Sequence, residues 1–158
     1  MPYIVLGLSA LIAVIDQIIK YFVVTDLKPI NKLEVIPGLF SLVYVENKGA
    51  AFGMLENARW IFIIFTIIVT IFLIALVLSK KINNKLFNIA SVLIIGGGIG
   101  NLIDRIFLGY VVDYLSVSFF PPVCNFADYC ITVGVALLAI YIVFYYGKEE
   151  KLKGKDNG

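Results

Sequence analysis

The sequence Gly96-Gly-Gly-Ile-Gly-Asn101-Leu-Ile-Asp104-Arg105 combines four glycines with three polar or charged residues in the third quarter of the chain. A run of apolar residues begins near Leu86 and continues into this segment. The run ends at Asn101, Asp104 and Arg105. Gly96 and Gly100 have the small-xxx-small spacing that allows close helix packing in membranes. The whole chain is 61% hydrophobic and only 15% charged. Ionisable groups at the end of an apolar segment are costly there, so they are candidates for a function.

The composition indicates a polytopic membrane protein. The 158 residues have a mean hydropathy of +0.97, whereas a soluble domain is about half apolar and about one quarter charged. A membrane span takes roughly 20 residues, so the length allows about four spans. We therefore expect an all-α membrane protein that forms a single domain over residues 1–158. Its four transmembrane helices are predicted at about residues 4–24, 60–79, 86–108 and 126–146.

The absence of histidine excludes several enzyme classes. A Ser-His-Asp triad, a Cys-His pair and a typical catalytic zinc site all need imidazole, and the chain has none. We expect neither a metal nor a cofactor. No basic patch with interleaved aromatic residues indicates nucleic acid binding. Cys124 and Cys130 are predicted to be free thiols, because their spacing across a helix start does not suit a disulfide.

The connections between the spans carry different signals. Residues 25–59 contain several Gly and Pro residues, which break any long helix. The segments Leu33–Ile36 and Leu39–Val45 have the composition of paired strands. We therefore predict a small extracytoplasmic β-structure between the first two helices. The segment from Asn47 to Met54 is small-residue rich and is either a site element or an ordinary turn. Residues 110–124 are interpreted as an external loop broken by Pro121 and Pro122.

Lysines orient the chain. Lys80, Lys81 and Lys85 lie in the short connection after the second span, and four more follow the last span. Positive charge marks cytoplasmic connections, so both termini are predicted to be cytoplasmic. The first span has no basic leader region or typical cleavage motif, and we interpret it as a retained helix.

With this orientation the intramembrane polar residues share one depth, near the outer leaflet. Asp16 and Lys20, four residues apart, lie on one helix face and should interact, and the alternative is a pair that only aids helix packing. Asn101, Asp104 and Arg105 reach a similar level on the third span. Arg105 beside Asp104 is predicted to hold that carboxylate as a brace.

Asp113 and Asp128 remain as the candidate catalytic pair. Neither has a cation next to it in the sequence, and we expect Asp113 to lie in an apolar loop and Asp128 in the first turn of the fourth span. Two close carboxylates cannot both ionise easily, so such a pair can hold one proton and act as base and acid on a water molecule. The structural alternative is that Asn125 and Asp128 form only a helix capping box.

Five ordered motifs resemble those of lipoprotein signal peptidases, the signal peptidase II family. They are Asp16-Gln-x-x-Lys20, Asn47-x-Gly49-Ala-Ala-Phe52, Gly100-Asn101-x-x-Asp104-Arg105, Val111-x-Asp113-Tyr114 and Asn125-x-Ala127-Asp128.

The resemblance implies a four-span aspartyl endopeptidase of the bacterial cytoplasmic membrane, without a metal or cofactor. Its substrate and partner would be a diacylglyceryl-prolipoprotein in membrane lipid, cut before the lipidated cysteine near the outer leaflet. It assigns catalysis to Asp113 and Asp128. It assigns support of the site or the substrate to Asp16, Lys20, Asn47, Gly49, Asn101, Asp104, Arg105 and Asn125. We expect a monomer.

Three other functions fit parts of the pattern. A Ser-Lys hydrolase would use Lys20 with one of the serines, but no Ser lies in a suitable turn. A small ion- or proton-conducting bundle would also place charges inside spans, but the second span offers only Thr66 and Thr70 as polar residues. A structural subunit would leave Asp113 and Asp128 without a role.

Overall fold

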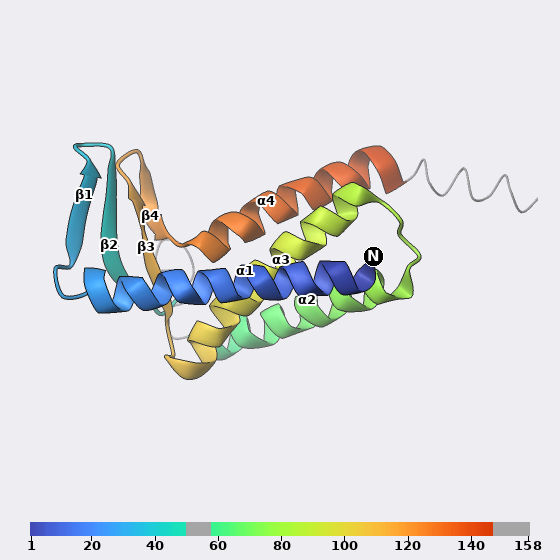
Figure 1. The fold of residues 1–158 in the computed structure, drawn as a ribbon, viewed down its shortest axis with the longest axis horizontal. Coiled ribbons are helices and arrows are strands. Elements are labelled where there is room, and N and C mark those ends of the chain that lie inside the picture. Colours follow the sequence, from blue (N-terminus) through green and yellow to red (C-terminus); the bar gives the residue numbers. More distant parts are fainter. Residues whose placement is uncertain (50–57, 147–158) are drawn as a thin grey trace, which may run out of the picture.

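In the computed structural model, which describes residues 1–49 and 58–146, four long helices form a bundle with a small sheet at one end (Figure 1). All four are long and apolar enough to cross a membrane, as the hydropathy predicts. They are α1 (Pro2–Phe22), α2 (Arg59–Ser79), α3 (Lys85–Phe107) and α4 (Phe126–Tyr141); α1 and α4 continue as single π-helical turns, Val23–Leu27 and Ile142–Tyr146.

Helix α3 is the centre of the bundle. It packs against the other three helices, and 56% of the residues in its most apolar stretch are buried in the bundle, compared with 17–22% for the other helices. Gly96 and Gly100 allow the close approach of α1. A Cβ at Gly96 would lie 2.7 Å from Ile12 Cβ, and one at Gly100 would lie 2.5 Å from Asp16 Oδ2. The predicted small-residue contact is therefore confirmed, and it brings α1 and α3 together at the level of Asp16.

The sheet is antiparallel, with the strand order β1-β2-β3-β4. Strands β1 (Lys32–Ile36) and β2 (Phe40–Asn47) form the predicted hairpin. The connection between α3 and α4 was interpreted as a loop, and that is wrong: it forms β3 (Val111–Val117) and β4 (Phe120–Cys124). Pro121 and Pro122 are compatible with this assignment because β4 is an edge strand, where a missing backbone N–H is tolerated.

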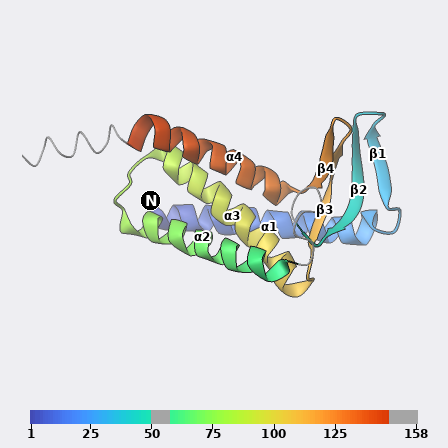
Figure 2. The same cartoon turned by 180° about the vertical axis from the view of Figure 1, so that it is seen from behind.

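The sheet stands at the opposite end of the bundle from the N-terminus and the α2–α3 connection, as the two opposite views show (Figures 1 and 2). Buried Val23 and Leu27, at the end of α1, pack against Val112 and Tyr114 of β3. The sheet is thus attached to the helices through an apolar cluster. Part of the small-residue segment Asn47–Met54, from residue 50 onward, lies outside the described residues. The lysines after residue 147, which predict a cytoplasmic C-terminus, also lie outside them.

Candidate active site

Lys20 is the buried cation of the site. Its Nζ lies 2.8 Å from Asp16 Oδ2 and 2.9 Å from Asp104 Oδ2, and it donates to Asn101 Oδ1 at 2.8 Å. An ammonium has three hydrogens, so each has an acceptor. Asp16 is fully buried and Lys20 is 3% exposed. The predicted interaction of Asp16 with Lys20 is confirmed. Lys20 also forms an ion pair with Asp104, so the cluster contains three charged groups.

The predicted brace between Asp104 and Arg105 is wrong. Adjacent residues on a helix do not face each other, and among the described residues the ion-pair partner of Asp104 is Lys20. The Arg105 guanidinium lies over the Phe62 ring of α2, 5.0 Å from its centroid, and it donates a long hydrogen bond of 3.5 Å to the Asn101 carbonyl. Arg105 therefore brings a positive charge toward α2 and the cavity described below.

The two carboxylates around Lys20 also hold the backbone of the site. Asp104 Oδ2 accepts a hydrogen bond from the Val112 N–H at 3.0 Å, and Asp16 Oδ1 accepts one from the Ala127 N–H at 3.2 Å. Val112 and Ala127 directly precede Asp113 and Asp128. The buried ion cluster thus fixes the chain immediately before each aspartate of the candidate pair.

Two asparagines connect the ion cluster to the aspartates. Asn101 accepts from Lys20, so its Nδ2 points the other way and donates to Asp128 Oδ1 at 2.8 Å. Asn125 Nδ2 donates to Asn101 Oδ1 at 3.1 Å and to Asp113 Oδ1 at 2.6 Å. Since Lys20 sets the orientation of Asn101, a single chain of hydrogen bonds runs from the cation to both carboxylates.

Asp113 projects from β3 and is 1% exposed. The expectation that it lies in an apolar loop is therefore wrong in its secondary structure. Besides the bond from Asn125, Asp113 accepts one from Asn47 Nδ2 at 2.7 Å. Burial and the negative charge of Asp128 raise the pKa of Asp113 to about 7, although the two amide donors act to lower it. A group with this pKa can both hold and release a proton near neutral pH.

Asp128 occupies the third position of α4, and the predicted capping box is present. The Asn125 side chain accepts from the Asp128 N–H at 2.9 Å, while Asp128 Oδ2 accepts from the Asn125 N–H at 3.0 Å. The helix N-terminus favours a negative charge there. The cap holds Asp128 in place without removing it from the site, because the same side chain also lines a cavity with Asp113.

This cavity has a volume of about 340 Å³ and is bounded by β2, α2, α3, β3, β4 and α4. Arg105, Asp113 and Asp128 supply its charges, and Phe62, Phe120 and Pro122 are among its apolar walls. The cavity is therefore amphipathic, with charged groups on one part of its lining and apolar walls on another.

Other predicted residues have defined places. Gly49 lines the cavity together with Asn47, and its N–H donates to the Asn47 side chain at 3.0 Å, so the described part of this segment contributes to the cavity. Cys124 and Cys130 are free, as predicted. Burial and the two aspartates raise the pKa of the Cys124 thiol. Within residues 1–49 and 58–146, no three His, Cys, Asp or Glu side chains are grouped to hold a metal ion.

A family model described as signal peptidase (SPase) II matches residues 8–144. The chain belongs to the signal peptidase II family. Among curated relatives, this chain is 46% identical over 138 residues to a lipoprotein signal peptidase of Caldanaerobacter subterraneus, covering 87% of this chain and 94% of the relative. It is 40% identical over 136 residues to that of Clostridioides difficile, covering 85% and 90%.

A solved bacterial membrane enzyme is also similar, with a TM-score of 0.80 and 32% identity over 88% of this chain and 87% of that one. A second has a TM-score of 0.78 and the same identity, over 89% and 93%. These matches support a lipoprotein signal peptidase function for this chain, and thus a multi-pass membrane protease. They do not favour an ion-conducting bundle.

Two residues that contact the site, Gln17 and Phe62, are not among the predicted site residues. Gln17 donates to Asp104 Oδ1 at 2.9 Å and to the Gly100 carbonyl at 3.1 Å, so it adds a second link between α1 and α3. The Phe62 ring makes a cation–π contact with the Arg105 guanidinium. Gln17 has a signal in the sequence, since it is a polar residue next to Asp16 inside an apolar span. Phe62 has none, because it is one of many large apolar residues in the second span.

Proposed function

We propose that this signal peptidase II is an aspartyl endopeptidase that removes the signal peptide from diacylglyceryl-modified bacterial prolipoproteins, cutting before the lipidated cysteine. Asp113 and Asp128 are its catalytic pair. The observation that carries the proposal is that both carboxylates line one cavity and are connected through Asn125, which donates to Asp113 and caps the helix at Asp128. Apolar walls next to them suit a lipidated substrate.

The two aspartates have different environments, which divides their roles. Asp128, in the first turn of a helix, is the base and takes a proton from the attacking water. Asp113, which has a pKa of about 7, is the acid and gives its proton to the carbonyl oxygen. When the tetrahedral intermediate collapses, the leaving amine receives the proton held by Asp128, and a hydroxyl of the intermediate returns one to Asp113.

The other polar residues support this pair. Asp16, Lys20, Asn101 and Asp104 position it through the ion cluster and the backbone hydrogen bonds described above. Arg105 adds a cation to the cavity, where its guanidinium offers donors to substrate carbonyl groups. Asn125 holds both aspartates in place. Asn47 and Gly49, on β2 and the turn after it, close the cavity on the sheet side.

The membrane arrangement follows from the lysines. We propose that one integral domain spans the bacterial cytoplasmic membrane as a monomer, with Lys80 and Lys81 at the cytoplasmic face and the sheet outside. The active site then lies near the outer leaflet. A substrate with two acyl chains on its cysteine is anchored at that depth, so its scissile bond arrives beside the pair.

The Ser-Lys alternative has little support in the geometry. It requires a neutral lysine within reach of a serine, yet all three Lys20 donors have acceptors, two of them carboxylates. Ser9, the serine on the same helix, donates instead to the Val5 carbonyl at 2.9 Å.

Purified protein mixed with diacylglyceryl-modified and unmodified precursors tests the proposal, with products identified by mass. We expect cleavage of the modified precursor alone, immediately before its cysteine and with or without a chelator. Asp113→Asn and Asp128→Asn should each abolish turnover while retaining precursor binding, and the double variant should be no worse, because either loss disables one unit. Asp26→Asn, at an exposed site, is the matched control. Substantial turnover by either site variant would reject the pair.

A further inference from the structure

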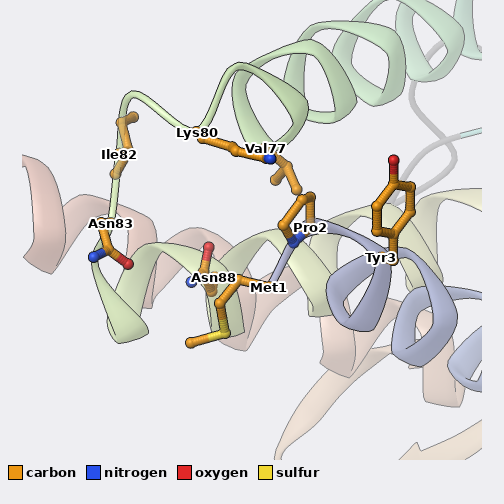
Figure 3. A pocket seen from close by; sticks show the side chains of 8 residues that line it. All are labelled: Met1, Pro2, Tyr3, Val77, Lys80, Ile82, Asn83 and Asn88. Carbon is orange, nitrogen blue, oxygen red and sulfur yellow. The ribbon is translucent and has the colours of Figure 1, made fainter.

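A second polar cavity lies at the end of the bundle opposite the sheet. It has a volume of about 410 Å³ and is formed by the first residues of α1, the end of α2, the α2–α3 connection and the first turn of α3 (Figure 3). Pro2, Val77 and Ile82 give it apolar walls, and Lys80, Asn83 and Asn88 give it polar groups. The proposed proteolytic chemistry uses none of these residues.

The backbone turns Lys80 toward this cavity. Lys80 ends α2 in the left-handed conformation, with φ of 56°. In Figure 3 its side chain extends beside Val77 toward Pro2, while Asn83 and Asn88 border the same space from the connection and from α3. Within residues 1–49 and 58–146, these three polar side chains have neither a hydrogen bond nor an ion pair. One ammonium and two amides are thus available as donors to a ligand.

The charge at this end of the described bundle is positive. Lys80, Lys81 and Lys85 lie in or beside the connection, whereas the sequence has no Asp or Glu before Asp16 or between Arg59 and Asp104. No carboxylate from the adjoining parts of α1, α2 or α3 therefore competes for the lysines. Donors and positive charge, with no carboxylate beside them among the residues that the structure describes, define a site for an anion.

We propose that this cavity binds the phosphate of an anionic phospholipid. The cavity lies where the spans end, at headgroup depth, and the surface beside it is apolar and exposed: Tyr3 is 81% exposed and Ile4 61%. Lys80 neutralises the phosphate, and the Asn83 and Asn88 amides donate to its oxygens. The acyl chains then lie along the apolar surface of α1. Basic pockets between helices at a membrane surface recognise such headgroups.

Native mass spectrometry of the purified full chain tests this, with phosphatidylglycerol, phosphatidylcholine or inorganic phosphate added. The wild type should retain phosphatidylglycerol over phosphatidylcholine. Lys80→Gln should lower that retention by at least about fivefold. Lys85→Gln removes the same charge outside the cavity and should have little effect. Asn88→Leu keeps every charge but removes a donor, so it should also lower retention. Thermal unfolding and precursor cleavage should stay unchanged in all three variants.

Equal losses in Lys80→Gln and Lys85→Gln would overturn the site, because they would indicate a diffuse attraction to the surface. Equal retention of the two lipids by the wild type would also overturn it. If inorganic phosphate displaced phosphatidylglycerol at equal concentration, the ligand would be a soluble anion and the lipid assignment would be wrong. Precursor cleavage measured on the same samples separates these outcomes from a failure of the proposed peptidase function.

Discussion

Asp104 Oδ2 accepts the backbone N–H of Val112 at 3.0 Å while the same oxygen lies 2.9 Å from Lys20 Nζ. Asp16 makes the corresponding pair of contacts with Lys20 and with the N–H of Ala127. One buried cation therefore holds two carboxylates, and each carboxylate fixes the residue before a proposed catalytic aspartate. The geometry of the pair depends on a charge that does not touch either aspartate.

Replacing Lys20 with Met should destabilise the protein by about 3–5 kcal/mol, because it leaves two buried carboxylates without their counter-ion. Turnover of the precursor should fall as well. The control is Lys28→Met, which removes an exposed ion pair with Glu46 and should cost about 0–1 kcal/mol. Thermal unfolding in detergent measures both. Equal costs for the two variants would show that the ion cluster does not hold the site together.

The activity should fall on the alkaline side with an apparent pKa near 7, because Asp113, with a pKa of about 7, must be protonated to act as the acid. Asn47→Ala removes a donor that lowers this pKa, so the protonated form should persist to higher pH. The alkaline limb of kcat/KM should then move upward in pH. Thr132→Ala, at the cavity edge, should leave it in place. A downward shift in Asn47→Ala would contradict the assignment of Asp113 as the acid.

Gly100→Ala should destabilise the protein by about 1–3 kcal/mol, as overpacking does. Its Cβ would lie 2.5 Å from Asp16 Oδ2, which the ion pair with Lys20 prevents from moving away. Gly98→Ala makes the same change on the same helix, but its Cβ would meet only Thr66 and Thr70 at 3.5 and 3.6 Å. That variant should be neutral or slightly stabilising, since Ala favours helix. Thermal unfolding compares the two, and a stable Gly100→Ala would mean that α1 and α3 can separate here.

The proposed orientation predicts that position 32 is outside and position 81 inside. In a background with Cys124→Ala and Cys130→Ala, which should remain active, Lys32→Cys and Lys81→Cys provide single labelling sites. A membrane-impermeant thiol reagent added to intact cells should label the first, and only disrupted cells should allow labelling of the second. External labelling at position 81 would invert the chain and move the proposed active site to the inner leaflet.

The contiguous features of this protein were predictable from its sequence. The helices begin and end within two residues of the predicted spans, apart from the π-helical continuations, because an apolar segment in a membrane must satisfy its own backbone hydrogen bonds. The capping box at Asn125 and Asp128, the pairing of Asp16 with Lys20 and the first hairpin are also local. Each depends on residues close together in the chain.

The contacts between residues far apart in the chain became known only from the tertiary structure. The sequence favoured Arg105 as the partner of Asp104, yet Lys20, 84 positions before Asp104, takes that place. Val111–Val117 contains β-branched and aromatic residues of the kind that favour strands, but only pairing with β2 makes it a strand and brings Asn47 to Asp113. Hydrophobicity and local geometry fix the helices because they act over a few neighbouring residues. The partner of a buried charge depends on which helix faces pack together, and that depends on the whole bundle.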